Sequence, residues 1–302
     1  MYTLDSLNTI LKVLTENEKI VDLIDVEKAF KEKSPRLYRI LPRFFINYLK
    51  KLVHQNDLNH ILRLHHDKTG LNFIKHSLAE MKIKTNSQGL ENIPEKGGVI
   101  VVSNHPLGGI DGAAIINEVG KARQDLHILV NDLIMQIKHF KPILIPVNKH
   151  GKTSRTNLSF IDTLYASEKC IMLFPAGLVS RRQKNKIIED LEWQKSFIAK
   201  SIKHQTNIIP VFIDGHNSKK FYNLAYWRKK LGIKANIEML FLADEMFKQK
   251  GNTINFTFGK SISWKLFNKE HTNLEWAQKV KKHVYALKSN KHKSFCQNID
   301  KA

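Results

Sequence analysis

The sequence predicts an α/β fold, with a mostly parallel mixed sheet flanked by helices and preceded by an N-terminal helical region. From about residue 89, short apolar runs rich in Val and Ile alternate with amphipathic segments, a pattern typical of a largely parallel sheet. Residues 1 to about 85 instead carry apolar side chains at helical spacing. We therefore predict two regions, a helical one over residues 1–86 and an α/β domain over residues 87–302 that ends in a basic tail.

The expected strands and helices alternate along the second region. The strands are expected at Gly98–Ser103, His127–Val130, Ile143–Val147, Cys170–Phe174 and Ile208–Ile213. The helices are expected at Asp111–Gly120, Asn157–Ser167 and Asp190–His204. In such sheets, ligands bind beyond the carboxyl ends of the strands. The informative loops are therefore those that follow Ser103, Val147, Phe174 and Ile213.

A basic, aromatic stretch at Ser34–Val53 stands out in the helical region. Its apolar positions Phe45, Leu49 and Leu52 recur at helical spacing, and Arg and Lys lie between them. The pattern fits a helix on a membrane surface, with cations facing lipid phosphates. It fits equally a helix that packs on the domain with solvated lysines. Pro42 predicts that the stretch is not one unbroken helix.

The unusual feature of the composition is its large excess of positive charge. The 302 residues include 49 Lys and Arg against 28 Asp and Glu, a net charge of +21 at pH 7. Such an excess indicates an anionic partner: nucleic acid, an anionic membrane surface, or an acidic substrate or carrier. The sequence shows no signal peptide, no apolar run of about 18 residues and no disulfide framework. We expect a protein that is cytoplasmic or attached to a membrane from its cytoplasmic side.

The loop after the first strand, Asn104–Asp111, carries a histidine and a carboxylate on a glycine-bearing turn. Gly108 and Gly109 allow a tight return that brings Asp111 to the ring of His105. A neutral histidine held by a carboxylate is a competent base for an alcohol, because the imidazolium that forms is stabilised in place. The alternative is an aspartate that caps a helix beside a histidine bonded to the backbone.

Two later segments offer groups for an anionic ligand. In the loop Phe174–Arg182, small residues allow close approach of the backbone, while Ser180, Arg181 and Arg182 offer donors. The segment Ile145–His150 adds Lys149 as a further cation. No Cys and His spacing resembles a zinc site, and no nucleotide-binding or Gly-x-Ser-x-Gly motif is present.

Taken in order, these loops resemble the glycerolipid acyltransferase superfamily, which contains the lysophosphatidic acid acyltransferases. Its first motif is Asn-His, four residues, then Asp, and the counterpart here is Asn104–Asp111. Its third motif, Phe-Pro-Glu-Gly-Thr-Arg-Ser, resembles Phe174–Arg181, and its fourth, an apolar strand with proline, resembles Ile209–Val211. The resemblance covers roughly residues 85 to 265.

Two departures from the family motifs point to a side branch. Five residues rather than four separate His105 from Asp111, and Ala176 replaces the usual glutamate. Both features, and the stretch Gly215–Tyr222, resemble the hemolysin-like acyltransferases, which include enzymes that O-acylate ornithine and glycine lipids. Since that glutamate is associated with glycerol phosphate recognition, Ala176 argues against a glycerol-3-phosphate acceptor.

The resemblance implies direct acyl transfer without a covalent acyl-enzyme. His105 is expected to remove the proton of the acceptor hydroxyl, and Asp111 to orient it. Arg181, with Arg182 or Lys149, is expected to hold the acceptor headgroup or a carrier phosphate. The other substrate-binding positions are expected at Asn104, Gly108, Gly109, Phe174, Pro175, Gly177 and Ser180.

The implied reaction is O-acylation of an aminoacyl lyso-lipid in bacterial membrane lipid synthesis. No bound cofactor or metal is expected; the acyl donor is acyl carrier protein or acyl-CoA, used as a substrate. The acceptor lies in a bilayer, which fits a membrane-surface role for residues 1–86 and a peripheral location on the inner face of the cell membrane. The charge is then explained by anionic lipids and carrier, without nucleic acid.

Three alternatives stay open at this point. The first is acylation of a lysophospholipid such as 1-acylglycerol-3-phosphate. The second is a basic nucleic-acid-binding protein, which predicts a steep salt dependence of binding but lacks the usual recognition motifs. The third is a catalytically inactive lipid-binding relative, and the presence of both His105 and Asp111 argues against it.

Overall fold

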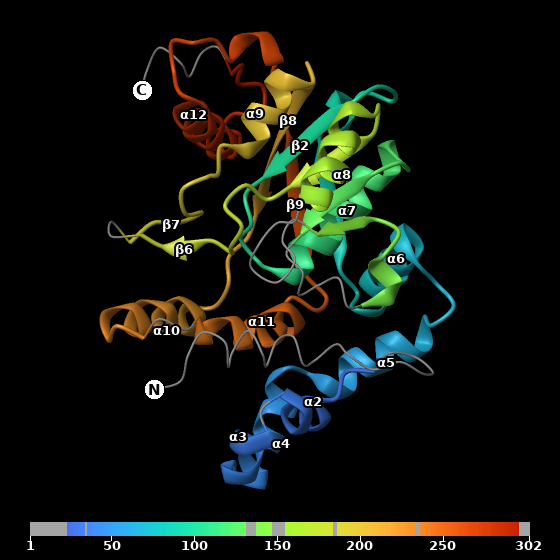
Figure 1. Cartoon of the computed structure of the whole chain (residues 1–302), viewed down its shortest axis with the longest axis vertical. Coiled ribbons are helices and arrows are strands. Elements are labelled where there is room, and N and C mark those ends of the chain that lie inside the picture. Colours follow the sequence, from blue (N-terminus) through green and yellow to red (C-terminus); the bar gives the residue numbers. More distant parts are fainter. Residues whose placement is uncertain are drawn as a thin grey trace.

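A mixed, mostly parallel sheet lies at the centre of the molecule, as predicted (Figure 1). The structure is a computed structural model that describes residues 23–33, 35–130, 137–146, 155–183, 186–233 and 236–295. Within these residues the sheet has seven strands in the order β1-β9-β8-β2-β5-β3-β4. They are β1 Lys84–Gln88, β2 Val99–Ser103, β3 His127–Val130, β4 Leu144–Pro146, β5 Cys170–Leu173, β8 Asn207–Asp214 and β9 Thr253–Phe258.

The five strands that the sequence predicts form the parallel part of the sheet. β2 pairs in parallel with both β5 and β8, and β3 pairs in parallel with β5 and β4. β9 runs antiparallel to β8, and β1 is parallel to β9. β1 and β9 were not predicted. β1 has the sequence Lys-Thr-Asn-Ser-Gln, without an apolar side chain, because it is an edge strand with no fully buried residue.

Helices cover both faces of the sheet, so the strands are buried on two sides. In β2, Val99 and Val101 pack in one apolar cluster, whereas Ile100 and Val102 pack in the other. The first cluster includes side chains of α6 and α7, and the second includes side chains of α8, α9 and α12. The bounds of these helices are α6 Gly70–Glu80, α7 Gly109–Ala122, α8 Arg155–Ala166, α9 Ser196–Lys203 and α12 Asn273–Ala286.

The remaining elements are short helices and a small hairpin. The helices are α2 Val26–Lys33, α3 Pro35–Ile40, α4 Arg43–Leu52, α5 Gln55–Leu64, α10 Lys219–Lys230 and α11 Leu242–Lys248. The 3-10 turns are η1 Leu90–Asn92, η3 Lys138–Phe140, η4 Ile237–Phe241 and η5 Trp264–Leu266. β6 Arg181–Arg182 and β7 Ile188–Glu189 form a separate antiparallel pair.

One predicted helix is too long. The sequence pattern predicts a helix over Asp190–His204, but α9 begins only at Ser196. Asp190 lies in the connection before the helix, where its carboxylate accepts hydrogen bonds from Ser180 and Trp193. These bonds hold the chain in a non-helical path, so tertiary contacts override the local pattern.

The N-terminal helices form their own small core below the sheet in Figure 1. Side chains of α2 and α4 pack there against Leu240, Phe241 and Ala243 of η4 and α11. Pro42 separates α3 from α4, as predicted. α6, which precedes residue 86, contributes to the main core instead.

The basic stretch combines a packed face with an exposed aromatic face. Ile46, Leu49 and Leu52 of α4 are buried. Phe45 was expected on that face, but it is 37% exposed, and Phe44 is 74% exposed. None of the helices in the described ranges is long and apolar enough to cross a membrane.

A buried carboxylate attaches the polar edge strand to the domain. Glu118 of α7 is almost fully buried and accepts hydrogen bonds from the hydroxyls of Thr85 and Ser87, both at 2.5 Å. Burial raises the pKa of Glu118, but Lys121 and the two hydroxyls outweigh this effect and lower it overall. The ionised carboxylate thus replaces the apolar contacts that β1 lacks.

We predict that Glu118→Ala destabilises the fold by about 2–4 kcal/mol, because it removes the charge-assisted bonds that hold β1. Urea denaturation of the variant measures the loss. Lys121→Ala is the comparison variant: it removes the half-exposed partner cation but keeps the carboxylate and its two hydroxyl bonds, so we expect a smaller loss of about 1–2 kcal/mol. Equal losses in the two variants would show that the hydroxyl bonds do not hold the strand.

Candidate active site

The predicted loops meet at the carboxyl edge of the parallel strands, because β2 lies between β5 and β8. Asn104 connects the loop after β2 to the end of β8. Its Nδ2 donates to the carbonyl of Ile213 at 2.9 Å, and its Oδ1 accepts from the amide of Ile213 at 2.7 Å. Asn104 is buried, so its amide serves to position the loop, a contact that the sequence prediction of a substrate-binding role did not foresee.

His105 and Asp111 come together as the sequence predicts. The Nδ1 of His105 lies 3.0 Å from the Oδ1 of Asp111, whose side chain is fully buried. The Oδ2 of Asp111 accepts from the backbone N–H of Leu107 at 2.7 Å. Gly108 has a φ of 87°, a left-handed conformation that turns the chain into α7 and places Asp111 in its first turn.

One face of the His105 ring makes an aromatic contact. It stacks on Phe174, the residue after β5, with ring centroids 4.0 Å apart and planes at 22°. Burial lowers the pKa of His105, but the charge of Asp111, with help from Asp190, outweighs burial and raises the pKa overall. An imidazole oriented in this way can accept a proton from a hydroxyl and be stabilised as the cation.

The backbone of His105 is fixed by a group that the sequence analysis missed. Asp190 is fully buried, and its Oδ1 accepts from the N–H of His105 at 3.2 Å and from the hydroxyl of Ser180 at 2.6 Å. Its Oδ2 accepts from Nε1 of Trp193 at 2.9 Å. Ser180 in turn donates its backbone N–H to the carbonyl of His105 at 2.8 Å. Asp190 and Ser180 therefore hold both backbone groups of His105.

The two arginines of the second loop lie in different environments. Arg181 is buried, donates to the carbonyl of Val179 at 2.9 Å and pairs with the buried carboxylate of Glu238 at 3.2 Å. Burial lowers the pKa of Arg181, and the pairing with Glu238 offsets part of this effect. Arg182 is partly exposed and donates to Asn223 of α10 at 3.0 Å. Glu238 also pairs with Arg228, a connection that sequence spacing did not indicate.

The remaining predicted positions shape the same loops. Pro175 is buried, and its carbonyl accepts from the N–H of Gln194. Gly177 is exposed, has a φ of 67° and closes a turn onto the carbonyl of Phe174. Gly109 is the exposed first residue of α7. Lys149 lies outside the described residues.

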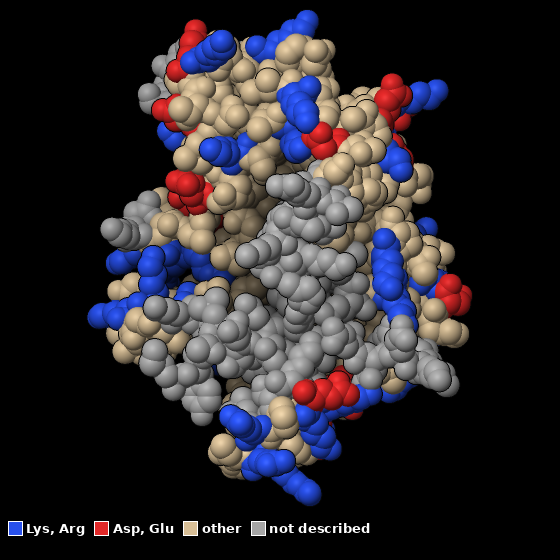
Figure 2. Space-filling view, viewed as in Figure 1, with Lys and Arg blue, Asp and Glu red and all other residues tan. Residues whose placement is uncertain are grey.

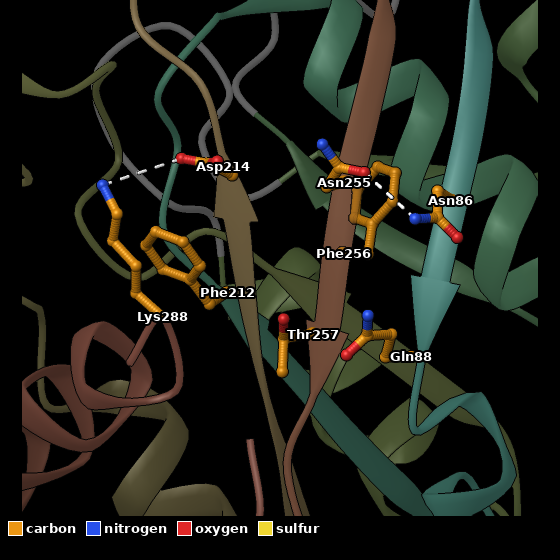
Figure 3. Close-up of a pocket in the computed structure, with 8 residues that line it drawn as sticks. All are labelled: Asn86, Gln88, Phe212, Asp214, Asn255, Phe256, Thr257 and Lys288. Atoms are coloured by element: carbon orange, nitrogen blue, oxygen red, sulfur yellow. Dashed lines mark hydrogen bonds and ion pairs between the residues drawn. The ribbon is translucent and has the colours of Figure 1, made fainter. Parts of the chain in front are cut away.

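A small cavity elsewhere on the sheet contains none of these residues (Figure 3). It measures about 150 Å³ and is lined by polar side chains of β1, β8 and β9, together with Phe212, Phe256 and Lys288. Asn86 donates there to Asn255 at 3.2 Å, and Lys288 lies 3.8 Å from Asp214. Among the described residues, no group of three or more His, Cys, Asp or Glu side chains is arranged to hold a metal ion.

A mostly parallel sheet with a His-Asp loop after one strand and a Phe-Pro loop after its neighbour defines a protein of the glycerolipid acyltransferase superfamily. The family model described as "Acyltransferase" matches residues 28–293, and the chain belongs to that family. It is therefore an acyltransferase enzyme, as the resemblance implied.

Named relatives match over nearly their full length. The chain is 44% identical over 266 residues to the "Lyso-glycine lipid O-acyltransferase" of Bacteroides thetaiotaomicron, a match that covers 88% of this chain and 97% of the relative. The protein with the same name from Phocaeicola vulgatus is 46% identical over 266 residues, with coverage of 88% and 95%. Among solved structures, the 1-acyl-sn-glycerophosphate acyltransferase of Thermotoga maritima aligns with a TM-score of 0.48 at 17% identity, covering 84% of this chain and 87% of that one.

We predict that loss of the Asp190 charge lowers the pKa of His105, because that charge favours the imidazolium. The variant Asp190→Asn is made in a Trp193→Phe background, since an amide nitrogen would otherwise face the indole N–H. NMR titration of labelled histidine measures the pKa, with Trp193→Phe alone as the control and His105→Gln to assign the signal. An unchanged or raised pKa in the double variant contradicts the electrostatic role of Asp190.

Proposed function

We propose that the enzyme transfers a fatty acyl group from an acyl thioester to the hydroxyl of a lyso-glycine lipid. The observation that carries the proposal is the match to two lyso-glycine lipid O-acyltransferases over 95% or more of their length. The site supports it, because a buried His-Asp pair suits the activation of a hydroxyl. Ala176, in place of the motif glutamate, agrees with an acceptor other than glycerol phosphate.

In the proposed reaction His105 acts as the general base. Its Nδ1 faces Asp111, so its Nε2 takes the proton of the acceptor hydroxyl while the oxygen attacks the thioester carbonyl. The C–O bond forms, the C–S bond breaks as the tetrahedral intermediate collapses, and the proton passes from His105 to the departing thiolate. Asp111 stabilises the imidazolium between the two steps.

The donor in this proposal is acyl carrier protein or acyl-CoA, each of which carries phosphate. Arg182 offers a partly exposed guanidinium beside the site, and Arg181 lies behind it with Glu238 as its partner. Arginine suits a phosphate because its planar group donates two parallel hydrogen bonds. We assign the donor phosphate, or the anionic acceptor headgroup, to this pair.

We further propose that the N-terminal helices rest on an anionic membrane surface. A strip of large apolar side chains is exposed there, with Ile40 76%, Phe44 74% and Tyr48 50% accessible. Arg36 and Arg39 precede this strip in the sequence, Arg43 lies between Ile40 and Phe44, and all three arginines are exposed. Figure 2 shows Lys and Arg gathered at this lower end of the molecule. Aromatic side chains beside cations suit the boundary between headgroups and acyl chains.

His105→Ala is expected to lower the turnover of lyso-glycine lipid by about 10²–10⁴, the usual contribution of a general base. Mass spectrometry of the diacylated product measures the rate with acyl carrier protein and with CoA donors. Retained folding, checked by circular dichroism, is the control. Near wild-type turnover contradicts the assignment of the base, and a faster reaction with lysophosphatidic acid than with lyso-glycine lipid contradicts the assignment of the acceptor.

The double variant Phe44→Ser, Phe45→Ser is expected to bind anionic vesicles at least about ten-fold more weakly, since each ring contributes roughly 1.5–3 kcal/mol when fully buried. Co-sedimentation with phosphatidylglycerol vesicles measures the binding. Leu274→Ser is the control, because Leu274 is an exposed apolar residue of α12, a helix at the opposite end of the molecule from the N-terminal helices in Figure 1. Equal binding by the double variant and the wild type contradicts this membrane face.

A further inference from the structure

A larger cavity separates the N-terminal helices from α10 and α11. It measures about 590 Å³, within the range of roughly 300–1,000 Å³ found for small-molecule sites. α4 forms one side, and α10, η4 and α11 form the other. The lining residues are Tyr48, Lys51, Leu52, Lys220, Phe221, Leu224, Phe241, Asp244, Glu245 and Lys248.

The walls of the cavity are apolar and its rim is cationic. Leu52 and Phe221 are buried, and Leu224 and Phe241 are partly buried, whereas Lys51 and Lys220 are exposed. Such a division suits an amphiphile, with its chain against the buried carbon surface and its headgroup near the lysines.

The two acidic residues of the lining are already paired. Asp244 is bound by Lys248 at 2.7 Å and by His54 at 3.3 Å. Glu245 is bound by the same Lys248 at 2.7 Å and accepts from the hydroxyl of Ser218 at 2.6 Å.

Lys51 and Lys220 have no acidic partner within the described part of the chain. The lining therefore has three lysines against two carboxylates, and this net positive charge suits an anionic headgroup.

The cavity lies between the proposed membrane face and the wall of the candidate active site. Tyr48 belongs both to the exposed strip and to the lining. At the opposite wall, the ring of Phe221 lies 5.1 Å from the guanidinium carbon of Arg181. On α11, Leu242 and Met246 face Gly108 and Gly109, while Asp244 and Glu245 line the cavity. One helix therefore separates the cavity from the His105 loop, and His105 is not part of its lining.

We propose that this cavity binds a single-chain amphiphile with an anionic headgroup, at a place distinct from the His105 loop. The chain packs against Leu52, Leu224 and Phe241, and Lys51 and Lys220 hold the headgroup. Both a free fatty acid and a carboxylate-headed lyso-lipid have this chemistry. The identification of the occupant as the acceptor, held between the bilayer and the site of reaction, rests on the proposed function.

Calorimetric titration with monomeric probes tests the site. N-palmitoylglycine carries the anionic headgroup without a hydroxyl to acylate, and its methyl ester carries the same chain without the charge. The wild type is expected to bind the acid about ten-fold more tightly than the ester. This ratio corresponds to the free energy of one hydrogen bond to a charged group. Palmitate is the third probe: tighter binding of palmitate identifies a fatty acid as the occupant, and tighter binding of N-palmitoylglycine identifies the acceptor.

Three variants locate the ligand. The double variant Lys51→Gln, Lys220→Gln is expected to lose the preference for the acid, and Leu224→Trp, which fills the cavity, is expected to abolish binding of both probes. Lys219→Gln is the matched control, because Lys219 is an exposed lysine of α10 outside the lining. Unchanged binding by Leu224→Trp, or equal affinity of the wild type for acid and ester, overturns the proposal.

Vesicle binding and kinetics separate this site from the membrane face and from the proposed reaction. If the double lysine variant loses vesicle binding as much as headgroup preference, the two lysines contact the bilayer and the proposal is wrong. His105→Ala is expected to bind N-palmitoylglycine as the wild type does. If the wild type binds the probe but does not acylate lyso-glycine lipid, the proposed function fails and the cavity site stands. If the wild type acylates lyso-glycine lipid but does not bind the probe, the cavity site is wrong and the proposed function stands.

Discussion

The buried carboxylate of Asp190 is the constraint on which the arrangement of the site depends. It accepts hydrogen bonds from the backbone of His105, the hydroxyl of Ser180 and the indole of Trp193, groups that come from three separate segments. Burial raises the pKa of the Asp190 carboxyl, and the hydrogen bonds from these three groups act against this effect, so the ionised form depends on all three segments being in place. The position of His105 is therefore determined by the same contacts that join the loops after β2 and β5.

The reactive pair needs this support because its own contacts are few. Asp111 fixes the ring of His105 through one nitrogen, and Phe174 covers one ring face. Neither contact fixes the backbone from which the ring extends. Asn104 and Ser180 supply that restraint, the first by bonding to Ile213 of β8 and the second by bonding to the His105 carbonyl. Catalytic groups held by rigid strands lose less rate to misplacement than groups on free loops.

The sequence predicted the parts of the fold that are decided by local composition. β2, β5 and β8 are apolar because both faces of each are covered, so their apolar runs are visible without a structure. β1 is held instead by Glu118, which is 31 residues from Ser87 along the chain, and its polar sequence gives no such signal. The start of α9 was placed too early for the same reason, because the contacts of Asp190 are tertiary.

In the candidate site, too, the local features were predictable from the sequence and the tertiary contacts were not. His105 and Asp111 were predicted to meet because a short turn connects them, and their side chains lie 3.0 Å apart. The partners of Asn104, Ser180 and Arg181 are Ile213, Asp190 and Glu238, and the separations of 109 and 57 residues to Ile213 and Glu238 carry no pattern in a single sequence. Sequence reasoning thus predicted that this histidine and carboxylate lie together, whereas the contacts that support them required the fold.

The cationic side chains behind the net charge of +21 have different surroundings. Arg181 and Arg228 share the buried carboxylate of Glu238, so together they leave a single positive charge near the site. Lys248 faces two carboxylates, those of Asp244 and Glu245, so this cluster has no positive charge in excess. The cations left for external anions include the exposed arginines of α3 and α4 and the two lysines at the rim of the cavity. These side chains lie on neighbouring helices at one end of the molecule, where the cavity is also lined. Under the proposed function, their positive field draws an anionic lipid to that end.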